Sequence, residues 1–275
     1  MTPLWHDYRG RAVLVTGGTR GIGLAVALAF ARRGADVTMT HRWGSADEDA
    51  IGRLFADAGA RKPRILEADV SKSDDIHGVM EAIRDSHGQL DAFVSNVAFA
   101  ALVRSLDDLV RRSLARSIDY TAWPLVEHTV SARRVFGKAP RYVVGMSSMG
   151  ADTVHMHYDF AAASKSVLET LCRYLHYRLR DEGTRVNVVR TRFVSTDSLM
   201  ATFGEAFEPF VRRIQPDVFS EPEEVAEATF AVCSGLFDAL GGQVLTVDRG
   251  ASNFENFSRM FVERNRHPLK QETPQ

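Results

Sequence analysis

Three side chains able to exchange protons lie close together in the middle of the sequence. Ser148 ends a strand-like run, and Tyr158 precedes Lys165 by seven residues. Seven residues are nearly two helical turns, so a phenol and an amine at this spacing share one helix face about 10 Å apart. A nearby ammonium lowers the pKa of a phenol from about 10 and improves it as a hydrogen-bond and proton donor. The pattern predicts stabilisation of negative charge on a substrate oxygen.

A serine hydrolase is excluded by the residues around Ser148. The sequence Gly145-Met146-Ser147-Ser148-Met149-Gly150 has methionine where the Gly-x-Ser-x-Gly elbow needs its second glycine. No Asp and His partners follow in the order such enzymes use.

A glycine-rich turn follows the first apolar run, Ala12–Val15. Its sequence is Thr16-Gly17-Gly18-Thr19-Arg20-Gly21-Ile22-Gly23. Gly17 permits a tight exit from a strand, Gly21 lets the backbone approach a pyrophosphate, and Gly23 lets a helix pack closely on the strand. The free N–H groups at the start of that helix attract phosphate. The turn therefore predicts a dinucleotide site that includes Thr19 and Ile22.

The type of nicotinamide cofactor is expected to be decided after the second strand, at Thr40-His41-Arg42. A carboxylate at this place accepts the ribose hydroxyls of NAD, whereas a cation accommodates the 2′-phosphate of NADP. No carboxylate occurs here before Asp47, and Arg20 lies in the glycine turn. Each arginine alone fits an exposed surface, but the two together, with His41, favour NADP(H).

Strand and helix patterns alternate along most of the chain and predict the frame for these residues. We expect right-handed βαβ units, hence an α/β fold with a single doubly wound, Rossmann-type parallel sheet and helices on both faces. The predicted strands are Ala12–Val15, Asp36–Thr40, Arg64–Glu67, Ala92–Ser95, Tyr142–Met146, Arg185–Val189 and Gln243–Val247. The predicted helices are Ile22–Arg33, Asp47–Ala58, Ser73–His87, Leu106–Arg134, Ala161–Asp181 and Pro222–Leu236.

Composition narrows the class of protein. The 275 residues are 45% hydrophobic and 25% charged with a net charge of -1, so we expect a globular protein that does not bind nucleic acid. No apolar run reaches the ~18 residues of a membrane span, and no secretory signal opens the chain. A cytoplasmic protein without a membrane partner is expected. Cys172 and Cys233 lack metal or disulfide spacing, so they are expected to be buried free thiols.

Taken together, these motifs resemble the short-chain dehydrogenase/reductase family over residues 11–250. The resemblance rests on the Gly-x3-Gly-x-Gly turn, on Asp69-Val70 after the third strand, and on Ser95-Asn96-Val97-Ala98 after the fourth. It implies that Asp69 and Val70 contact the adenine ring. It also implies that Asn96, with the small Ala98, holds the loop beside the cofactor.

The residues around Lys165 indicate which branch of the family the sequence resembles. Ala161 stands where most of the family has the tyrosine of Tyr-x3-Lys, whereas Tyr158 and Lys165 form Tyr-x6-Lys. This arrangement is similar to the divergent, NADPH-dependent branch of enoyl-acyl-carrier-protein reductases, as is Val194-Ser195-Thr196-Asp197-Ser198-Leu199. The resemblance implies that Val194 and Thr196 flank the nicotinamide. It also implies reduction of a C=C bond in an acyl thioester, linked to CoA or an acyl carrier protein, in fatty-acid or polyketide-type metabolism.

Several residues keep two other functions open. Ser148 stands at the catalytic serine of ketoreductases, which favours a carbonyl (3-oxoacyl) reductase. Ala161, and Asp119 at the position of a water-holding asparagine in the family, also fit a nucleotide-binding protein without turnover. Arg192 replaces the family's glycine near the nicotinamide end. His155 and His157 can approach a substrate, but without a third ligand they predict no metal site.

The remaining expectations concern the substrate lid, the assembly and the tail. Phe203, Phe207 and Phe210 recur at helical spacing within residues 197–220, which predicts one short amphipathic helix over the pocket. We expect Phe203 and Phe207 to bind an acyl chain there. Residues 1–250 are expected to be one catalytic domain, and residues 251–275 a tail. Pairing of the long helices Leu106–Arg134 and Ala161–Asp181, as in the family, predicts a homodimer or homotetramer.

Overall fold

Apolar side chains fill both faces of the central strands, which is what a sheet covered on two sides requires. The computed structural model describes residues 7–44, 46–99, 101–253, 255, 257–258 and 261–262. Its main sheet has seven parallel strands in the order β3-β2-β1-β4-β5-β6-β9. The strands are β1 (Ala12–Thr16), β2 (Asp36–His41), β3 (Arg64–Glu67), β4 (Ala92–Ser95), β5 (Tyr142–Ser148), β6 (Arg185–Thr191) and β9 (Val244–Val247).

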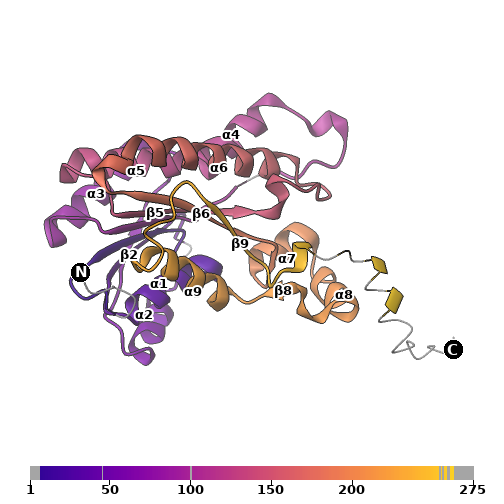
Figure 1. Cartoon of the computed structure of the whole chain (residues 1–275), viewed down its shortest axis with the longest axis horizontal. Helices are drawn as coiled ribbons and strands as arrows, with labels where there is room; N and C mark the ends of the chain where they lie inside the picture. Colours follow the sequence, from indigo (N-terminus) through magenta and orange to yellow (C-terminus); the bar gives the residue numbers. More distant parts are fainter. Residues whose placement is uncertain are drawn as a thin grey trace.

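Helices cover the two faces of this sheet (Figure 1). One hydrophobic core joins β1 and β2 to α1, α2 and α9, and a second joins the opposite face to α3, α5 and α6. The helices are α1 (Gly21–Ala31), α2 (Glu48–Asp57), α3 (Ser73–His87), α4 (Arg111–Thr121), α5 (Trp123–Phe136), α6 (Asp159–Leu179), α7 (Asp197–Phe203), α8 (Phe207–Ile214) and α9 (Pro222–Cys233). The predicted doubly wound α/β fold is confirmed.

The predicted helix Leu106–Arg134 is wrong as one element. It consists of a 3-10 turn at Leu106–Asp108, then α4, then α5, with the break at Ala122. Pro124 explains the break, because proline lacks an amide hydrogen and its ring crowds the carbonyl four residues earlier. The break turns Tyr120 and Thr121 toward the carboxyl ends of the strands, where both line a cavity.

The prediction of a single helix in the lid is also wrong. Gly204 adopts a φ of +86° and ends α7, and α8 starts afresh at Phe207. A separate pair of short parallel strands, β7 (Phe193–Val194) and β8 (Phe219–Ser220), brackets the two helices. In Figure 1 this lid, residues 193–220, extends beyond one end of the main sheet, apart from the two helical layers.

The ends of the chain add little to this frame. Ala251–Asn253 form a 3-10 turn, and most of the expected tail lies outside the described residues. Near the start, the Tyr8 hydroxyl donates a hydrogen bond to the Cys233 carbonyl. Both cysteines are buried free thiols. Within the described ranges, no helix is long and apolar enough to cross a membrane.

Candidate active site

A cavity of about 690 Å³ opens at the carboxyl ends of the central strands. In a doubly wound sheet this edge is where ligands bind. Most of the residues predicted to form a site line it: Gly17, Thr19, Arg20, Gly21, Ile22, His41, Arg42, Val70, Asn96, Ala98, Ser148, Tyr158, Lys165, Val194, Thr196 and Phe203. Gly23, Asp69 and Phe207 lie behind this lining, and each supports a residue that reaches the cavity.

The glycine turn is held closed by Asn96. The Asn96 side-chain amide donates to the carbonyl oxygens of Thr16 and Gly17, both at 3.1 Å, and its backbone N–H donates to the Thr16 hydroxyl. A Cβ at Gly23 would lie 2.2 Å from the Gly17 oxygen and 2.6 Å from the Asn96 Nδ2. Gly23 therefore serves the close packing of α1 on the turn rather than direct ligand contact.

Arg42 is fixed at one end of the cavity by two partners. Its guanidinium is 3.0 Å from the Asp69 carboxylate and hydrogen-bonds the Tyr120 hydroxyl. Tyr120 in turn donates to Asp69 over 3.2 Å. Although burial raises the pKa of Asp69, its hydrogen bonds with Ser71 and the charge of Arg42 leave that pKa below the usual value. Asp69 thus holds Arg42, and its expected contact with adenine stays a prediction.

Aromatic rings complete this end of the cavity. The Arg42 guanidinium lies 3.9 Å from the centre of the Trp43 ring, and Arg116 lies 4.7 Å from that of Phe99. Sequence reasoning missed Tyr120, Trp43, Phe99 and Arg116. Trp43 adjoins Arg42 in the sequence and could have been found, but Tyr120 and Arg116 come from a helix whose direction depends on the break at Ala122.

The lining fits a dinucleotide. Two buried polar atoms in it, the Thr40 hydroxyl and the His41 Nδ1, have no hydrogen-bond partner among the residues that the structure describes. Buried polar atoms are almost always paired, so these two indicate a bound polar group. Gly21, at a φ of +52°, lies across from Thr196, whose Cγ2 is 3.5 Å from where a Cβ would be. Arg20 and the start of α1 would hold the phosphates, and Val194 and Thr196 line the wall expected at the nicotinamide.

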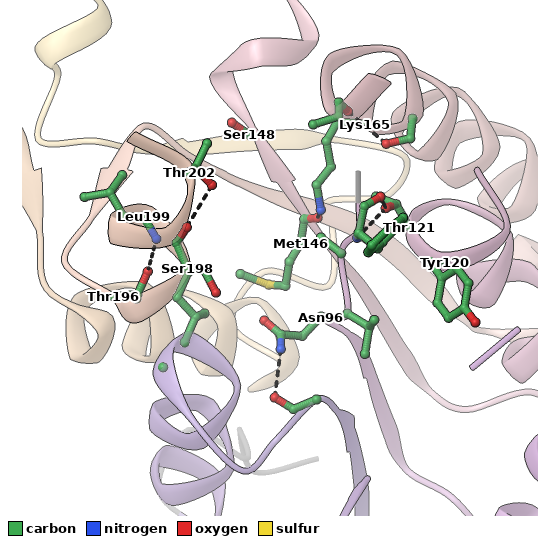
Figure 2. Close-up of a pocket in the computed structure, with 18 of the residues that line it drawn as sticks. Asn96, Tyr120, Thr121, Met146, Ser148, Lys165, Thr196, Ser198, Leu199 and Thr202 are labelled. Carbon is green, nitrogen blue, oxygen red and sulfur yellow. Dashed lines mark hydrogen bonds between the residues drawn. The ribbon is translucent and has the colours of Figure 1, made fainter. Parts of the chain in front are cut away.

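Lys165 points into the middle of the cavity (Figure 2). It reaches down from α6, with Ser198, Leu199 and Thr202 on one side and Tyr120 and Thr121 on the other. Its Nζ donates to the Met146 carbonyl over 2.6 Å. Burial lowers the pKa of Lys165 to about 8, and the carboxylate of Glu169 opposes the fall. The amine is therefore still mostly charged at pH 7 and can donate to hydroxyl groups beside it.

Tyr158 precedes α6 and packs its ring against Gly150. A Cβ at Gly150 would lie 2.6 Å from two carbons of that ring, so the ring occupies space that only glycine leaves. Burial raises the pKa of Tyr158, and its hydrogen bond with Ser148 opposes the rise. The structure thus brings the three predicted catalytic side chains to one cavity, with a neutral phenol as donor.

Other polar residues reach the same space. His155 lies edge-on to both Tyr158 and Phe193 with ring centres 6.0 Å apart, and its buried Nε2 has no partner in the described part of the chain. Burial and the charge of Arg192 lower the pKa of His155, which keeps the ring neutral. Arg192 lines the cavity while donating to the Ala251 carbonyl over 2.9 Å. His157 hydrogen-bonds the Val103 carbonyl through Nδ1 at 2.8 Å.

The aromatic lid forms one wall. Phe203 lines the cavity and stacks at 4.5 Å on Phe207, which lies behind it. Phe207 packs against Phe193 and against the small lid cluster that contains the buried Phe219. Phe210 is 52% exposed on the outer side of α8. The expectation that all three phenylalanines face the pocket is therefore wrong, because the break at Gly204 rotates α8 relative to α7.

Asp119 does not reach the cavity. It is exposed on α4, whereas Thr121 is buried at the cavity wall and both donates to and accepts from the backbone of Phe99. A side chain two residues along a helix points to a different face, so Asp119 is not placed to hold a water in the cavity. Among the described residues, no three His, Cys, Asp or Glu side chains gather as a metal ion would need.

The chain is similar to known reductases and dehydrogenases over most of its length. Residues 17–252 match a family model described as Enoyl-(Acyl carrier protein) reductase. The chain is 29% identical to 1-cyclohexenylcarbonyl-CoA reductase of Streptomyces collinus over 257 residues, which cover 89% of this chain and 88% of that protein. It is 26% identical to the NADH enoyl-acyl-carrier-protein reductase of Aquifex aeolicus over 250 residues, 88% and 91% of the two chains. A solved structure of a short-chain dehydrogenase from Burkholderia cenocepacia in complex with NADP is 25% identical with a TM-score of 0.78, covering 90% and 99% of the two chains.

The packing of Tyr158 on Gly150 can be tested by adding one methyl group. Gly150→Ala should displace the phenol and lower kcat by about 100-fold, the scale of a misplaced reacting group, while cofactor affinity changes less than about twofold. Steady-state kinetics and fluorescence titration with cofactor measure the two effects. Gly78→Ala in α3, where a Cβ meets nothing within 4 Å, is the matched control. An unchanged kcat in Gly150→Ala would show that the ring position is not needed.

Proposed function

This chain belongs to the short-chain dehydrogenase/reductase family, and from that premise we propose that it reduces the C=C bond of an enoyl thioester with NADPH. One observation carries the proposal. Tyr158 lines the same cavity as Lys165, whereas Ala161, at the place of the family's usual tyrosine, lines it without a proton donor. The other phenol of the lining, Tyr120, is hydrogen-bonded to Arg42 and Asp69. Both members of the Tyr-x6-Lys pair therefore reach one cavity, which supports the proposal.

The side chains suit this reaction. NADPH, when bound, supplies a hydride to the β-carbon of the unsaturated thioester, and negative charge then collects on the thioester oxygen. Tyr158 donates a hydrogen bond to that oxygen, because burial raises its pKa and keeps the phenol protonated. Lys165 holds the ribose hydroxyls with its ammonium and adds positive charge near the enolate. The lid excludes water from the reacting atoms.

Two cations support NADPH as the cofactor. Arg20 and Arg42 both line the cavity at the end of β1 and β2, and residues 40–44 contain no carboxylate. Asp69 neutralises part of the Arg42 charge, yet it also fixes the guanidinium so that less freedom is lost on binding phosphate. A 2′-phosphate would then meet one preorganised arginine, Arg42, and one exposed arginine, Arg20.

The lid supports an acyl substrate. Phe193, Leu199 and Phe203 form an apolar wall opposite Lys165, which suits a hydrocarbon chain better than a sugar or an amino acid. A CoA thioester and an acyl-carrier-protein thioester share this acyl group. They differ in what lies outside the cavity mouth.

The hydrogen bond between Ser148 and Tyr158 favours a second candidate, reduction of a 3-oxoacyl thioester. A serine and a tyrosine that both face one carbonyl oxygen can polarise it and protonate the resulting alkoxide. The two candidates share cofactor and lid, and differ in whether the hydride reaches a carbon of C=C or of C=O.

Turnover separates these candidates. Oxidation of NADPH with crotonyl-CoA should exceed that with acetoacetyl-CoA, and Tyr158→Phe should lower kcat for the enoyl substrate by about 100-fold or more. Absorbance at 340 nm follows both reactions. Tyr174→Phe, on the exposed side of α6, should behave as the parent. Turnover of the 3-oxo substrate alone would support the carbonyl reductase, and tight NADPH binding without any turnover would support a non-catalytic protein.

Cofactor preference tests the arginine pair. The parent should use NADPH at least about tenfold more efficiently than NADH, a difference of about 1.4 kcal/mol. Arg42→Gln should abolish most of this preference by weakening NADPH, because the phosphate loses its fixed partner. Arg61→Gln, which removes an exposed arginine paired with Asp36, is the control. Equal kcat/KM for the two cofactors in the parent would contradict the assignment.

The two phenylalanines of the lid should differ in effect. Phe203→Ala should raise KM for a dodecenoyl thioester by about tenfold and for a crotonyl thioester much less, since each buried methylene contributes about 0.8 kcal/mol. Phe207→Ala should act more weakly because its ring only supports Phe203 from behind. Phe210→Ala should change neither KM. Equal KM changes for short and long substrates would place the acyl chain elsewhere.

A further inference from the structure

A chain of buried charges lies directly behind Lys165. Glu169, one turn further along α6, is 4% exposed, and Arg190 on β6 is 8% exposed. The Arg190 Nε donates to the Glu169 carboxylate over 2.9 Å, and its Nη2 binds the other oxygen. Ser147 donates to the same carboxylate over 2.6 Å. The remaining Nη1 of Arg190 pairs with Asp152 in the turn after β5.

The register of the sheet produces this contact. Ser147 on β5 pairs directly with Arg190 on β6, so both side chains project to the face covered by α6. A carboxylate at i+4 from a lysine is the spacing at which the two form an ion pair on a helix. Here the Lys165 Nζ binds the Met146 carbonyl instead, 2.6 Å away. Both oxygens of Glu169 are taken by the planar guanidinium, which matches a carboxylate better than an ammonium does.

We propose that Arg190 is a positioning residue for the site: by binding both oxygens of Glu169 it keeps that carboxylate from drawing Lys165 out of the cavity. Through Asp152 it also anchors the turn at residues 149–152, which carries Gly150 beneath the Tyr158 ring. Arg190 is not among the described residues that line the cavity. The proposal rests on the proposed function only in one respect, that Lys165 binds the ribose hydroxyls of the cofactor.

The charged groups around Lys165 determine in which direction its pKa should shift in each variant. Glu169 lies one turn away on α6, Arg190 of β6 binds Glu169, and Asp152 in the turn after β5 binds Arg190. Tyr158, just before α6, lines the same cavity. The loop histidine His155, with Arg192 and, from α4, Arg116 and Tyr120, lines other parts of the same cavity. Glu169 is the charge that acts on Lys165 directly, and it raises the pKa that burial lowers.

Removing one partner or the other should therefore move the Lys165 titration in opposite directions. Arg190→Gln leaves the Glu169 anion unbalanced, so the pKa of Lys165 should rise by about one unit or more. Glu169→Gln removes the stabilising anion, so the same pKa should fall by about one unit. A charged amine is the form that donates to hydroxyls, so cofactor affinity should be lost at higher pH in Arg190→Gln and at lower pH in Glu169→Gln than in the parent.

The experiment is an NMR titration of the lysine amines in the full chain, followed by pH profiles. The sequence has five lysines, so selective ¹³Cε labelling with Lys165→Arg as the assignment variant resolves the signal. Parent, Arg190→Gln and Glu169→Gln are titrated without any ligand. NADPH affinity and kcat are then measured across pH, and Arg190→Gln should also lower kcat at neutral pH by about tenfold or more. Arg133→Gln, which breaks an exposed pair with Glu182, is the matched control.

Arg190→Lys keeps the proposal testable if Arg190→Gln does not fold. It preserves the charge but cannot hold two oxygens, so kcat should fall while the Lys165 titration stays near that of the parent. Opposite shifts in the two neutral variants support the positioning role, whatever thioester the enzyme reduces. Shifts in the same direction, or none, overturn it. Opposite shifts in the two variants, combined with a parent that does not bind NADPH, would contradict the proposed function and leave the role of Arg190 intact.

Discussion

The site depends on two hydrogen bonds from the Asn96 amide to the carbonyl oxygens of Thr16 and Gly17. They join the ends of β1 and β4, which are neighbours in the sheet. From β1 the strand order runs outward through β2 to β3, and from β4 it runs the other way through β5 and β6 to β9. At such a point the two following loops diverge, and the space between them is open to a ligand. Gly23 can approach this junction because it has no side chain, which brings the start of α1 and its free N–H groups to the same opening.

Positive charge is distributed along the cavity in two different ways. At the end of β2, Arg42 is held by Asp69 and Tyr120 beside exposed Trp43, so its charge is partly balanced but its geometry is fixed. In the middle, Lys165 is buried with a carbonyl as its hydrogen-bond partner, while the nearby carboxylate is bound by Arg190. Burying several ionic groups costs free energy unless each is paired, and these pairs leave the Lys165 ammonium free of a carboxylate partner in the middle of the cavity.

The lid is built differently from the rest of the chain. It has its own two-stranded sheet and a small cluster of Val218, Phe219 and Ala251, with Phe193 and Phe207 packed against them. Phe203 connects this cluster to the cavity, and Val194 of β7 belongs to the first of the two main cores. A segment with its own small core can adjust its position with little change in β5, which carries Ser148, or in α6, which carries Lys165.

Much of this protein was determined by local sequence. The seven strands, the glycine turn and the Tyr158–Lys165 spacing follow from hydrophobic periodicity and from glycine chemistry, which act over a few residues. Pro124 and Gly204 break two predicted helices for local reasons, and tertiary structure decided what those breaks bring to the site. Tyr120 rather than Asp119 lines the cavity, and Phe203 lines it with Phe207 stacked behind, while Phe210 is exposed. Asp69 became the partner of Arg42, and Glu169 that of Arg190, because side chains far apart in sequence meet only when strand register and helix packing bring them together.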